Sequence, residues 1–535
     1  MNAKNIFISL LMVVFVITSC DDKLELNDPN SLTTAEYWQT EQHMAEAVIG
    51  VYQTSFYITA YSLFPGFTDG RADDVYGDSG WVLYPKITNF TVQPGGMGIG
   101  NIWSVYYQGI FRANQVLDKI DDVEFADQDY KNRLKGQALF WRGYCYFHLV
   151  FNFDKVPLIL TLPQTKEDYY PSQSSAEVVY AQVESDLSEA ASLLPQSYEQ
   201  VEGPDAGQKG RITWGSATGM LAKVLMQQNK IDEAKILLKT IIDSEQYALV
   251  DNYFDNFTYS NENNEESLFE LQFGILGTAE GGMGAPQADW RQANGINYNY
   301  GISNFTAYED FEATEWFYNE FYKERTINGR IDPRCYFSLV HNEPEYDTEL
   351  YDDDPWGRRN KIFGVNPWTD IENFNASKYY IAKYTYARIP GHSLEGDGVR
   401  GNSKINYRVL RYADVLLLYA ECINETEGAT PDCYNYIQMV RDRVNLPDLT
   451  TVKPGMSKEE MREQIYHERA LELGVEATRW LDIRRWGWLD DPSMVEELKT
   501  RDPHDYTTYV NGTEYYPIPQ SEMDVNPNLE PNINH

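Results

Sequence analysis

The segment from Thr213 to Tyr247 constrains the fold of this chain more than any other. Its sequence, TWGSATGMLAKVLMQQNKIDEAKILLKTIIDSEQY, contains two helix-forming runs separated by Asn229 and Lys230. A helix, a tight turn and a second helix form an antiparallel helical hairpin. Hairpins of this kind stack side by side into a curved scaffold whose surface suits the binding of a partner.

Four other segments also have the periodicity of helices. Thr34–Phe56 and Asn101–Ile120 place apolar residues three, four or seven positions apart. Gly136–Phe153 is apolar nearly all round, which predicts a buried helix. Ser174–Pro195 begins with a Ser and Glu capping pattern and ends at a proline. Helical periodicity then returns from Arg408 onward, so helices are expected on both sides of a different middle region.

That middle region, residues 251–407, is dominated by Gly, Asn, Asp, Pro and aromatic residues. Its periodic stretches are short, which predicts long loops with short strands and a few helices. Long loops in a compact chain carry function more often than structure. The closing segment, residues 515–532, contains too many prolines for regular structure and is predicted to lie extended against the body. The predicted fold is therefore mostly α, with a large irregular face.

The beginning of the chain has the pattern of a targeting segment. Lys4 precedes the apolar run Ile6–Ile17, which is shorter than the ~20 residues that a membrane-spanning helix needs. This pattern predicts a signal peptide over residues 1–19. The ending Ile-Thr-Ser-Cys resembles a bacterial lipobox, which implies cleavage before Cys20 and lipid on its sulfur. Residues 20–33 would then form an acidic tether. The alternative is an ordinary signal peptide with an incidental cysteine.

Charge limits the possible partners. The chain has 44 basic and 81 acidic residues, a formal net charge of −37. A nucleic-acid-binding protein needs a basic surface, and no run of Lys or Arg supplies one, so nucleic acid is excluded as a partner. An anionic membrane surface is an equally poor partner without a lipid anchor. Arg142, Arg411 and Glu421 lie within apolar helical segments, where buried charges need partners, so structural ion pairs are expected there.

The cysteines give no sign of a metal or redox site. If Cys20 carries lipid, four cysteines remain, and none belongs to a C-x-x-C pair, which argues against zinc and thioredoxin-like chemistry. Cys145 lies in the apolar helix and is predicted to be a small buried residue. Cys422 and Cys433 flank a turn between two predicted helices and are close enough in sequence to pair, but spacing alone does not establish a disulfide.

Two other patterns resemble functional motifs and fail on inspection. GGMGIG at Gly95–Gly100 precedes a helix, but no βαβ pattern surrounds it, so a loop is predicted and not a dinucleotide site. YHERALE at Tyr466–Glu472 would need histidine at 471 to bind zinc, and that residue is Leu471. With no G-x-S-x-G motif or phosphate-binding loop either, we predict no catalytic residues, metal or cofactor.

Two loops combine carboxylates with aromatic rings. TDGRADDVYGDSGWVLYP spans residues 68–85, and APQADWRQANGINYNYGISNF spans residues 285–305. Carboxylates accept hydrogen bonds from sugar hydroxyl groups, and aromatic rings stack on sugar faces. A turn with a tryptophan in the core explains the first loop equally well, and the sequence does not show whether the two loops meet. The candidate ligand-binding residues are Asp69, Asp73, Asp74, Trp81, Trp290, Tyr298 and Tyr300.

The chain resembles the SusD/RagB family of Bacteroidetes surface lipoproteins. The motifs that carry this resemblance follow in order over nearly the whole chain and are specific only together. They are RADDVY, GQALFWRGYCYFHLVFNFDKVPLI, VYAQVESDLSEAASLLP, GRITWGSATGMLAKVLMQQNKIDEA, NEESLFELQF, NYRVLRYADVLLLYAECINE, ERALELGVEATRWLDIRRW and YYPIPQSEMDVNPNL. One departure is Phe153 before Asp154, where the family usually has glycine.

The resemblance implies a right-handed superhelix of tetratricopeptide-like helical hairpins. An N-terminal helical region would span residues 34–250, a ligand face 251–407, and C-terminal helices with an extended tail 408–535. Such a protein is lipid-anchored in the outer membrane and faces the outside. It captures an oligosaccharide without catalysis and passes it to a SusC-like TonB-dependent transporter. A RagB-like role in peptide uptake and a surface glycosidase are the alternatives.

Overall fold

The computed structural model describes residues 37–60, 67–79, 83–96, 98–274, 295–303, 307–362, 365–370, 374–389 and 403–532. Four long helices form its N-terminal part: α3 (Glu41–Ala60), α6 (Ile99–Lys119), α7 (Gln128–Phe153) and α8 (Ala176–Leu193). Helix α7 packs against both α6 and α8 and is buried on nearly every side, which confirms the predicted buried helix. It begins earlier than predicted because the Asp127 side chain accepts a hydrogen bond from the Asp129 amide and caps it.

The predicted hairpin between Thr213 and Tyr247 is confirmed. It consists of α9 (Trp214–Gln227) and α10 (Ile231–Asp243). Asn229 turns the chain with a left-handed φ of 57°, a conformation that asparagine adopts more readily than most residues. Glycine is required at Gly219, because a Cβ atom there would lie 2.3 Å from Leu410 Cδ2. Helix α9 can therefore lie directly on the segment that contains Leu410.

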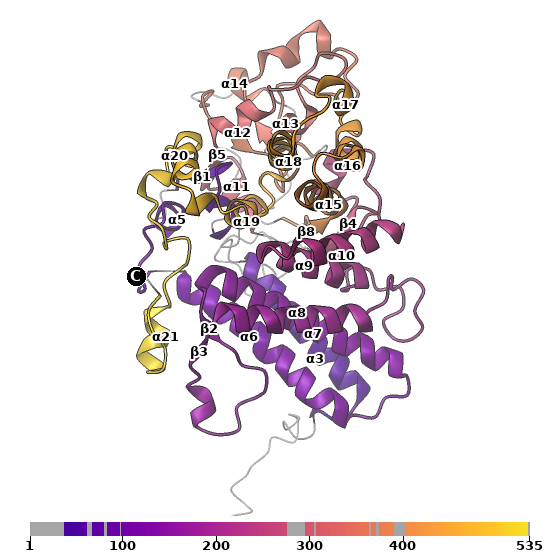
Figure 1. The fold of residues 1–535 in the computed structure, drawn as a ribbon, viewed down its shortest axis with the longest axis vertical. Coiled ribbons are helices and arrows are strands. Elements are labelled where there is room, and N and C mark those ends of the chain that lie inside the picture. Colours follow the sequence, from indigo (N-terminus) through magenta and orange to yellow (C-terminus); the bar gives the residue numbers. More distant parts are fainter. Residues whose placement is uncertain are drawn as a thin grey trace, which may run out of the picture.

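The C-terminal helices extend the same stack. In Figure 1, α9 and α10 lie between the N-terminal helices and the C-terminal ones, and α15 packs against α10, α16 and α18. The mostly α fold class is confirmed by this arrangement. The C-terminal elements are α15 (Tyr412–Glu427), α16 (Pro431–Asp442), α17 (Leu449–Val452), α18 (Lys458–Leu473), α19 (Arg479–Arg485), η10 (Trp488–Asp490), α20 (Pro492–Arg501) and η11 (Tyr506–Thr508).

The described middle region contains short elements joined by irregular chain, as expected. Within the residues that the structure describes, every sheet is a two-stranded antiparallel pair. The division of the chain at residues 34, 251 and 408 stays a prediction. The elements from residue 253 to 381 are η5 (Tyr253–Phe257), β4 (Ser267–Leu271), α11 (Ile296–Tyr300), β5 (Phe311–Ala313), α12 (Glu315–Glu320), α13 (Pro333–Ser338), β6 (Leu339–Val340), η8 (Pro344–Asp347), η9 (Glu349–Tyr351), α14 (Pro367–Asp370) and β7 (Tyr380–Ile381).

One helix prediction was wrong at its start. The residues from Arg408 were expected to be helical, but Tyr407–Arg411 forms strand β8, which pairs with β4, and α15 begins only at Tyr412. When this segment is read alone, its apolar residues also fit the start of a helix. Pairing with β4, far away in sequence, decides the conformation.

The tail lies against the body as predicted, with a short helix inside it. The Tyr516 amide donates to the Asn152 carbonyl (2.7 Å), and the Asn532 side chain donates to the Phe153 carbonyl (3.0 Å). Both carbonyls belong to the last turn of α7, so the tail satisfies acceptors that a helix end leaves free. Helix α21 (Gln520–Val525) interrupts the extended conformation. The remaining early elements are η2 (Asp69–Arg71), β1 (Val75–Gly77), α5 (Leu83–Thr88), η3 (Ile120–Asp122), β2 (Val156–Pro157), η4 (Glu167–Tyr169) and β3 (Gln173–Ser174).

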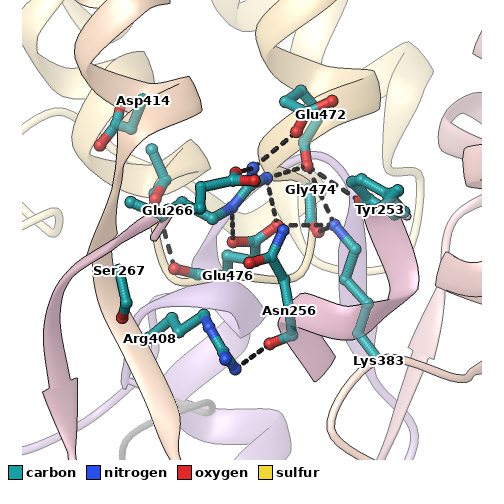
Figure 2. A network of polar contacts seen from close by, with 12 residues as sticks. Tyr253, Asn256, Glu266, Ser267, Lys383, Arg408, Asp414, Glu472, Gly474 and Glu476 are labelled. Atoms are coloured by element: carbon teal, nitrogen blue, oxygen red, sulfur yellow. Dashed lines mark hydrogen bonds and ion pairs between the residues drawn. The ribbon is translucent and has the colours of Figure 1, made fainter. Parts of the chain in front are cut away.

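A buried network of ion pairs joins the middle region to α18 (Figure 2). Arg411, at the end of β8, lies 2.7 Å from Glu266, 2.6 Å from Glu472 and 2.8 Å from Glu476. Lys383 lies 2.8 Å from Glu476. Burial alone would raise the pKa of Glu472, but the charges of nearby arginines outweigh it and hold that pKa well below its usual range. Glu472 therefore stays charged in the interior.

The other buried charges are also paired. Arg142 lies 2.7 Å from Asp186, and Arg485 forms an ion pair with Glu421. With Arg411, they confirm that the charges of the apolar helical segments form structural ion pairs.

The four described cysteines are free thiols buried in the core. Cys145 is fully buried, as predicted. Cys422 Sγ lies 3.4 Å from Met226 Sδ, and Cys433 Sγ lies 3.3 Å from the Ala420 carbonyl oxygen, so the two residues do not pair in this structure. Among the described residues, no helix has the length and apolar character needed to cross a membrane.

Candidate functional site

The structure brings together the described parts of the two loops that carry the candidate ligand-binding residues. Strand β1 pairs with β5, and the Tyr300 hydroxyl donates a hydrogen bond to Asp69. Trp81 and Trp290 lie outside the described residues, and so does the side chain of Tyr298. The convergence that the sequence left open therefore exists for the described residues.

The three candidate aspartates, however, do not face solvent. Asp73 is fully buried and accepts hydrogen bonds from Arg479 Nε (2.6 Å) and Arg501 Nη1 (3.0 Å). Asp69 accepts from the Ala477 amide at 2.6 Å, and Asp74, also fully buried, accepts from the Val475 amide at 2.9 Å. These contacts link the first loop to the segment between α18 and α19.

The predicted sugar contacts at Asp69, Asp73, Asp74 and Tyr300 are therefore corrected. Tyr300 is also buried, with 1% of its surface exposed. Their side chains form a structural junction inside the protein in place of a surface for a ligand. The other explanation that the sequence allowed for the first loop was a turn with a tryptophan in the core, and Trp81 lies outside the described residues.

The junction contains carboxyl groups with opposite pKa shifts. Burial alone would raise the pKa of Asp73, but Arg479 and Arg501 outweigh it, so this pKa is lowered. Burial and the charge of Asp74 raise the pKa of Asp69 to about 8, and burial and the charge of Asp73 raise the pKa of Asp74 to about 7. Asp69 and Asp74 therefore hold their protons to a higher pH than an ordinary aspartate does.

Asp69 and Asp74 predict a pH dependence of stability. Their folded pKa values lie above the ~3.9 of an unfolded aspartate. Their contribution to stability is thus fully present below about pH 4 and is lost as the pH rises through 7 and 8. The melting temperature should fall when the pH is raised from 5 to 8.5, as differential scanning fluorimetry can measure. Asp74→Asn should flatten this fall, and an unchanged slope in that variant would contradict the assignment.

Beside the junction lies a partly exposed polar surface, which we call the β1–β5 rim, in which Asp78 and His504 are exposed and Glu312 is buried. It consists of Tyr76, Asp78, Glu309, Glu312, Lys378 and His504. The Tyr76 hydroxyl donates to Glu312 (2.8 Å), directly across the strand pair. On its other side, the Tyr76 ring stacks on the exposed His504 ring, with centroids 4.0 Å apart and planes within 7°. The rim therefore presents a fixed pair of stacked rings beside carboxylates.

One lysine holds the acidic side chains of the rim together. Lys378 Nζ lies 2.9 Å from Glu309 and 3.3 Å from Asp78, and it also pairs with Glu312. Burial would lower the pKa of Lys378, but its bonds to Glu312 and Glu309 outweigh burial and raise that pKa. The Asp78 side chain is 58% exposed and that of Lys378 25% exposed. The rim thus offers an ammonium donor, the exposed carboxylate of Asp78 as an acceptor, and an aromatic platform.

Such a surface suits a ring-shaped ligand rich in hydroxyl groups. Carboxylates accept hydrogen bonds from hydroxyl groups, an ammonium group donates them, and stacked rings present an apolar face. Sequence reasoning missed Glu312, Lys378 and His504 because no motif surrounds them. Only the pairing of β1 with β5, together with the return of the segment after α20, places them beside Tyr76. The sequence predicted short strands in the middle region but none in the first loop, so it carried no signal for this pairing.

Comparisons with known proteins agree with this architecture along the chain. A sequence profile described as "SusD family" matches residues 243–535, and one described as "Starch-binding associating with outer membrane" matches residues 22–226. "SusD-like protein P25" from Formosa agariphila is 27% identical over 99% of this chain and 98% of its own length.

Solved structures show the same fold. A crystal structure of a SusD superfamily protein from Bacteroides vulgatus has a TM-score of 0.76 and 27% identity, covering 92% of this chain and 98% of that one. A "Laminarin binding SusD-like protein" has a TM-score of 0.70 and 25% identity, covering 93% and 100%. These matches confirm the predicted SusD-like helical fold. By its profile match over more than half of its length, the chain belongs to the SusD family.

Proposed function

We propose that this protein is a cell-surface glycan-binding lipoprotein that captures a neutral oligosaccharide and does not cleave it. The observation that carries this proposal is its likeness over nearly the whole chain to a family member that is named for laminarin binding. The rim supports the proposal with its stacked Tyr76 and His504 rings and the donors and acceptors beside them. Trp81, Trp290 and Tyr298 remain proposed ligand contacts.

The charge of the protein favours an uncharged glycan. The chain carries a net charge of −37, and three carboxylates gather around the single ammonium group of Lys378 at the rim. Sulfated or uronate-rich chains would be repelled by this field. A neutral glucan chain meets no such cost and can still form hydrogen bonds with Asp78 and Lys378, whose side chains are accessible.

The proposal includes the place where the protein works. Lipid on Cys20 would anchor the chain in the outer membrane, facing outward, and the captured glycan would pass to a SusC-like TonB-dependent transporter. The lipobox-like ending before Cys20 supports the anchor. The profile description, "associating with outer membrane", supports the location. Diacylglycerol on the sulfur of Cys20 and a third acyl chain on its new amine would exceed the about two signals that stable anchoring requires.

Replacing Tyr76 with alanine should weaken glycan binding if the rim is the site. The loss of one stacking ring costs about 1–3 kcal/mol by analogy with base–aromatic stacking, so the dissociation constant should rise about 5- to 150-fold. Isothermal titration calorimetry with laminarin oligosaccharides measures this change. This rise in the dissociation constant is predicted for whichever glycan the wild-type protein binds.

Tyr169→Ala is the matched control, because Tyr169 is 66% exposed and lies outside the rim. It should bind like the wild-type protein. Equal affinity in Tyr76→Ala would remove the rim from the proposal. Binding of peptides with no response to any glycan would favour the RagB-like alternative, and release of reducing ends during incubation would favour the glycosidase.

A further inference from the structure

A cleft of about 680 Å³ opens between α12, α18 and the segment from η10 to α20. It adjoins the junction, because Arg479 and Arg501 line the cleft and also bind Asp73, and none of the rim residues lines it. We call it the Trp316 cleft. Its volume falls within the range of small-molecule binding pockets. The proposed function makes no use of it.

The walls of the Trp316 cleft are aromatic and rigidly held. The guanidinium carbon of Arg501 lies 4.7 Å from the Trp316 ring centroid and 5.0 Å from that of Trp488. The guanidinium carbon of Arg479 lies 5.1 Å from each of the same two rings. On the α18 side, the Tyr466 ring centroid is 5.4 Å from that of Trp488. Cation–π contacts of this kind fix the rings before any ligand arrives.

The cations of the cleft are matched by carboxylates. Lys323 pairs with Glu320 at 2.5 Å, and Lys453 pairs with Glu324 at 2.6 Å. Arg479 and Arg501 share Asp73. Because the cations of the cleft are already paired, the cleft attracts an anion only weakly. The paired groups can still form hydrogen bonds with a ligand.

The paired groups remain within reach of a ligand. The Lys323 side chain is 60% exposed and that of Lys453 is 42% exposed, so both ammonium groups can donate to an incoming oxygen. Glu460 and Glu463 are exposed at the edge and accept hydrogen bonds. Aromatic walls combined with paired, accessible polar groups suit an uncharged ligand with apolar ring faces and many hydroxyl groups.

The aromatic surface continues past Tyr466. A second cleft of about 450 Å³ shares Tyr466 with the first and is also lined by Trp486, Glu425 and Arg462. The Trp486 and Trp488 ring centroids lie 4.9 Å apart. Tyr466, Trp486 and Trp488 therefore form one aromatic cluster that both clefts share.

We propose that the Trp316 cleft is a second binding site for a neutral oligosaccharide, separate from the β1–β5 rim. This inference rests on the proposed function for the class of its ligand. A protein with two sites holds a long glycan chain more tightly than either site holds a short one, because the second contact is intramolecular. The Trp316 cleft would then help to retain polysaccharide at the cell surface.

The test blocks the cleft from its exposed edge. Glu463→Trp places a large side chain at the exposed edge of α18, and Glu459→Trp places the same side chain on the same helix outside the cleft. Calorimetry with a laminarin hexasaccharide should give two sites in the wild type and in Glu459→Trp. It should give one site in Glu463→Trp, and in Tyr76→Ala one site of unchanged affinity and one weakened about 5- to 150-fold. Tyr466→Ala, checked for an unchanged melting temperature, should match Glu463→Trp.

The outcomes separate the two proposals. Loss of one site and an at least 10-fold weaker retention on insoluble laminarin in Glu463→Trp would support the second site. Two unchanged sites in that variant, or a single wild-type site removed by Tyr76→Ala, would overturn the inference and leave the proposed function intact. No binding of any glycan by the wild type would overturn both.

Discussion

Replacing Glu472 with alanine is expected to lower the free energy of unfolding by about 3–5 kcal/mol, the range for breaking a buried ion pair from one side. Glu472 is fully buried and accepts hydrogen bonds from Arg411 (2.6 Å) and Arg334 (3.0 Å), while Arg443 also pairs with it. Without Glu472, these arginines lose a shared counter-ion in the interior (Figure 2). Guanidinium chloride titration followed by circular dichroism measures the loss.

Two variants make this result specific. Glu472→Gln keeps the size of the side chain and should still destabilise the protein strongly, because the loss comes from the missing charge. Glu463→Ala, on the exposed face of the same helix, should change the free energy of unfolding by no more than about 0.5 kcal/mol. If Glu472→Ala behaved like Glu463→Ala, the network would not hold the middle region to α18.

Replacing Asp73 with alanine should have a similarly large effect, again about 3–5 kcal/mol. Asp73 is the shared partner of Arg479 and Arg501, and all three side chains lie at the junction between the first loop and the C-terminal helices. Arg479 is 2% exposed, so it would keep its charge without a counter-ion in a place that water barely reaches. The same denaturant titration measures this change.

Asp78→Ala is the matched comparison for Asp73→Ala. Asp78 belongs to the same loop, but its side chain is 58% exposed at the rim. This variant should fold with an unchanged melting temperature and bind glycan more weakly. Normal stability with lost glycan binding in Asp73→Ala would restore Asp73 as a ligand contact and contradict the buried junction.

The contrast between Asp73 and Asp78 explains where reasoning from sequence was misled. Both residues are aspartates in one Gly-rich loop, next to aromatic residues. Their roles differ because Arg479 and Arg501, more than 400 residues away, cover one of them and not the other. A loop sequence describes the chemistry that a side chain can perform, whereas packing decides whether a ligand can reach it.

Local sequence also left the start of α15 open. Arg408 to Arg411 satisfies a helical pattern and a strand pattern about equally, and hydrogen bonding to β4 selects the strand.

For the buried charges, in contrast, the sequence predicted the interaction but not the partners. An arginine such as Arg411 in an apolar segment needs an anion wherever the chain places it, so an ion pair was predictable although its partners Glu266, Glu472 and Glu476 were not.

The amino-acid sequence alone therefore determined the helical class, the hairpin at Thr213–Tyr247, the buried helix α7, the need for internal ion pairs and the likeness to a family. Each of these depends on periodicity, capping or charge within a short segment, or on the order of motifs. Only the tertiary structure decided which carboxylates are buried, that Tyr76 meets Glu312 across a strand pair, and that Trp316, Tyr466 and Trp488 enclose one cleft. Those results depend on contacts between segments far apart in the chain, which no local pattern encodes.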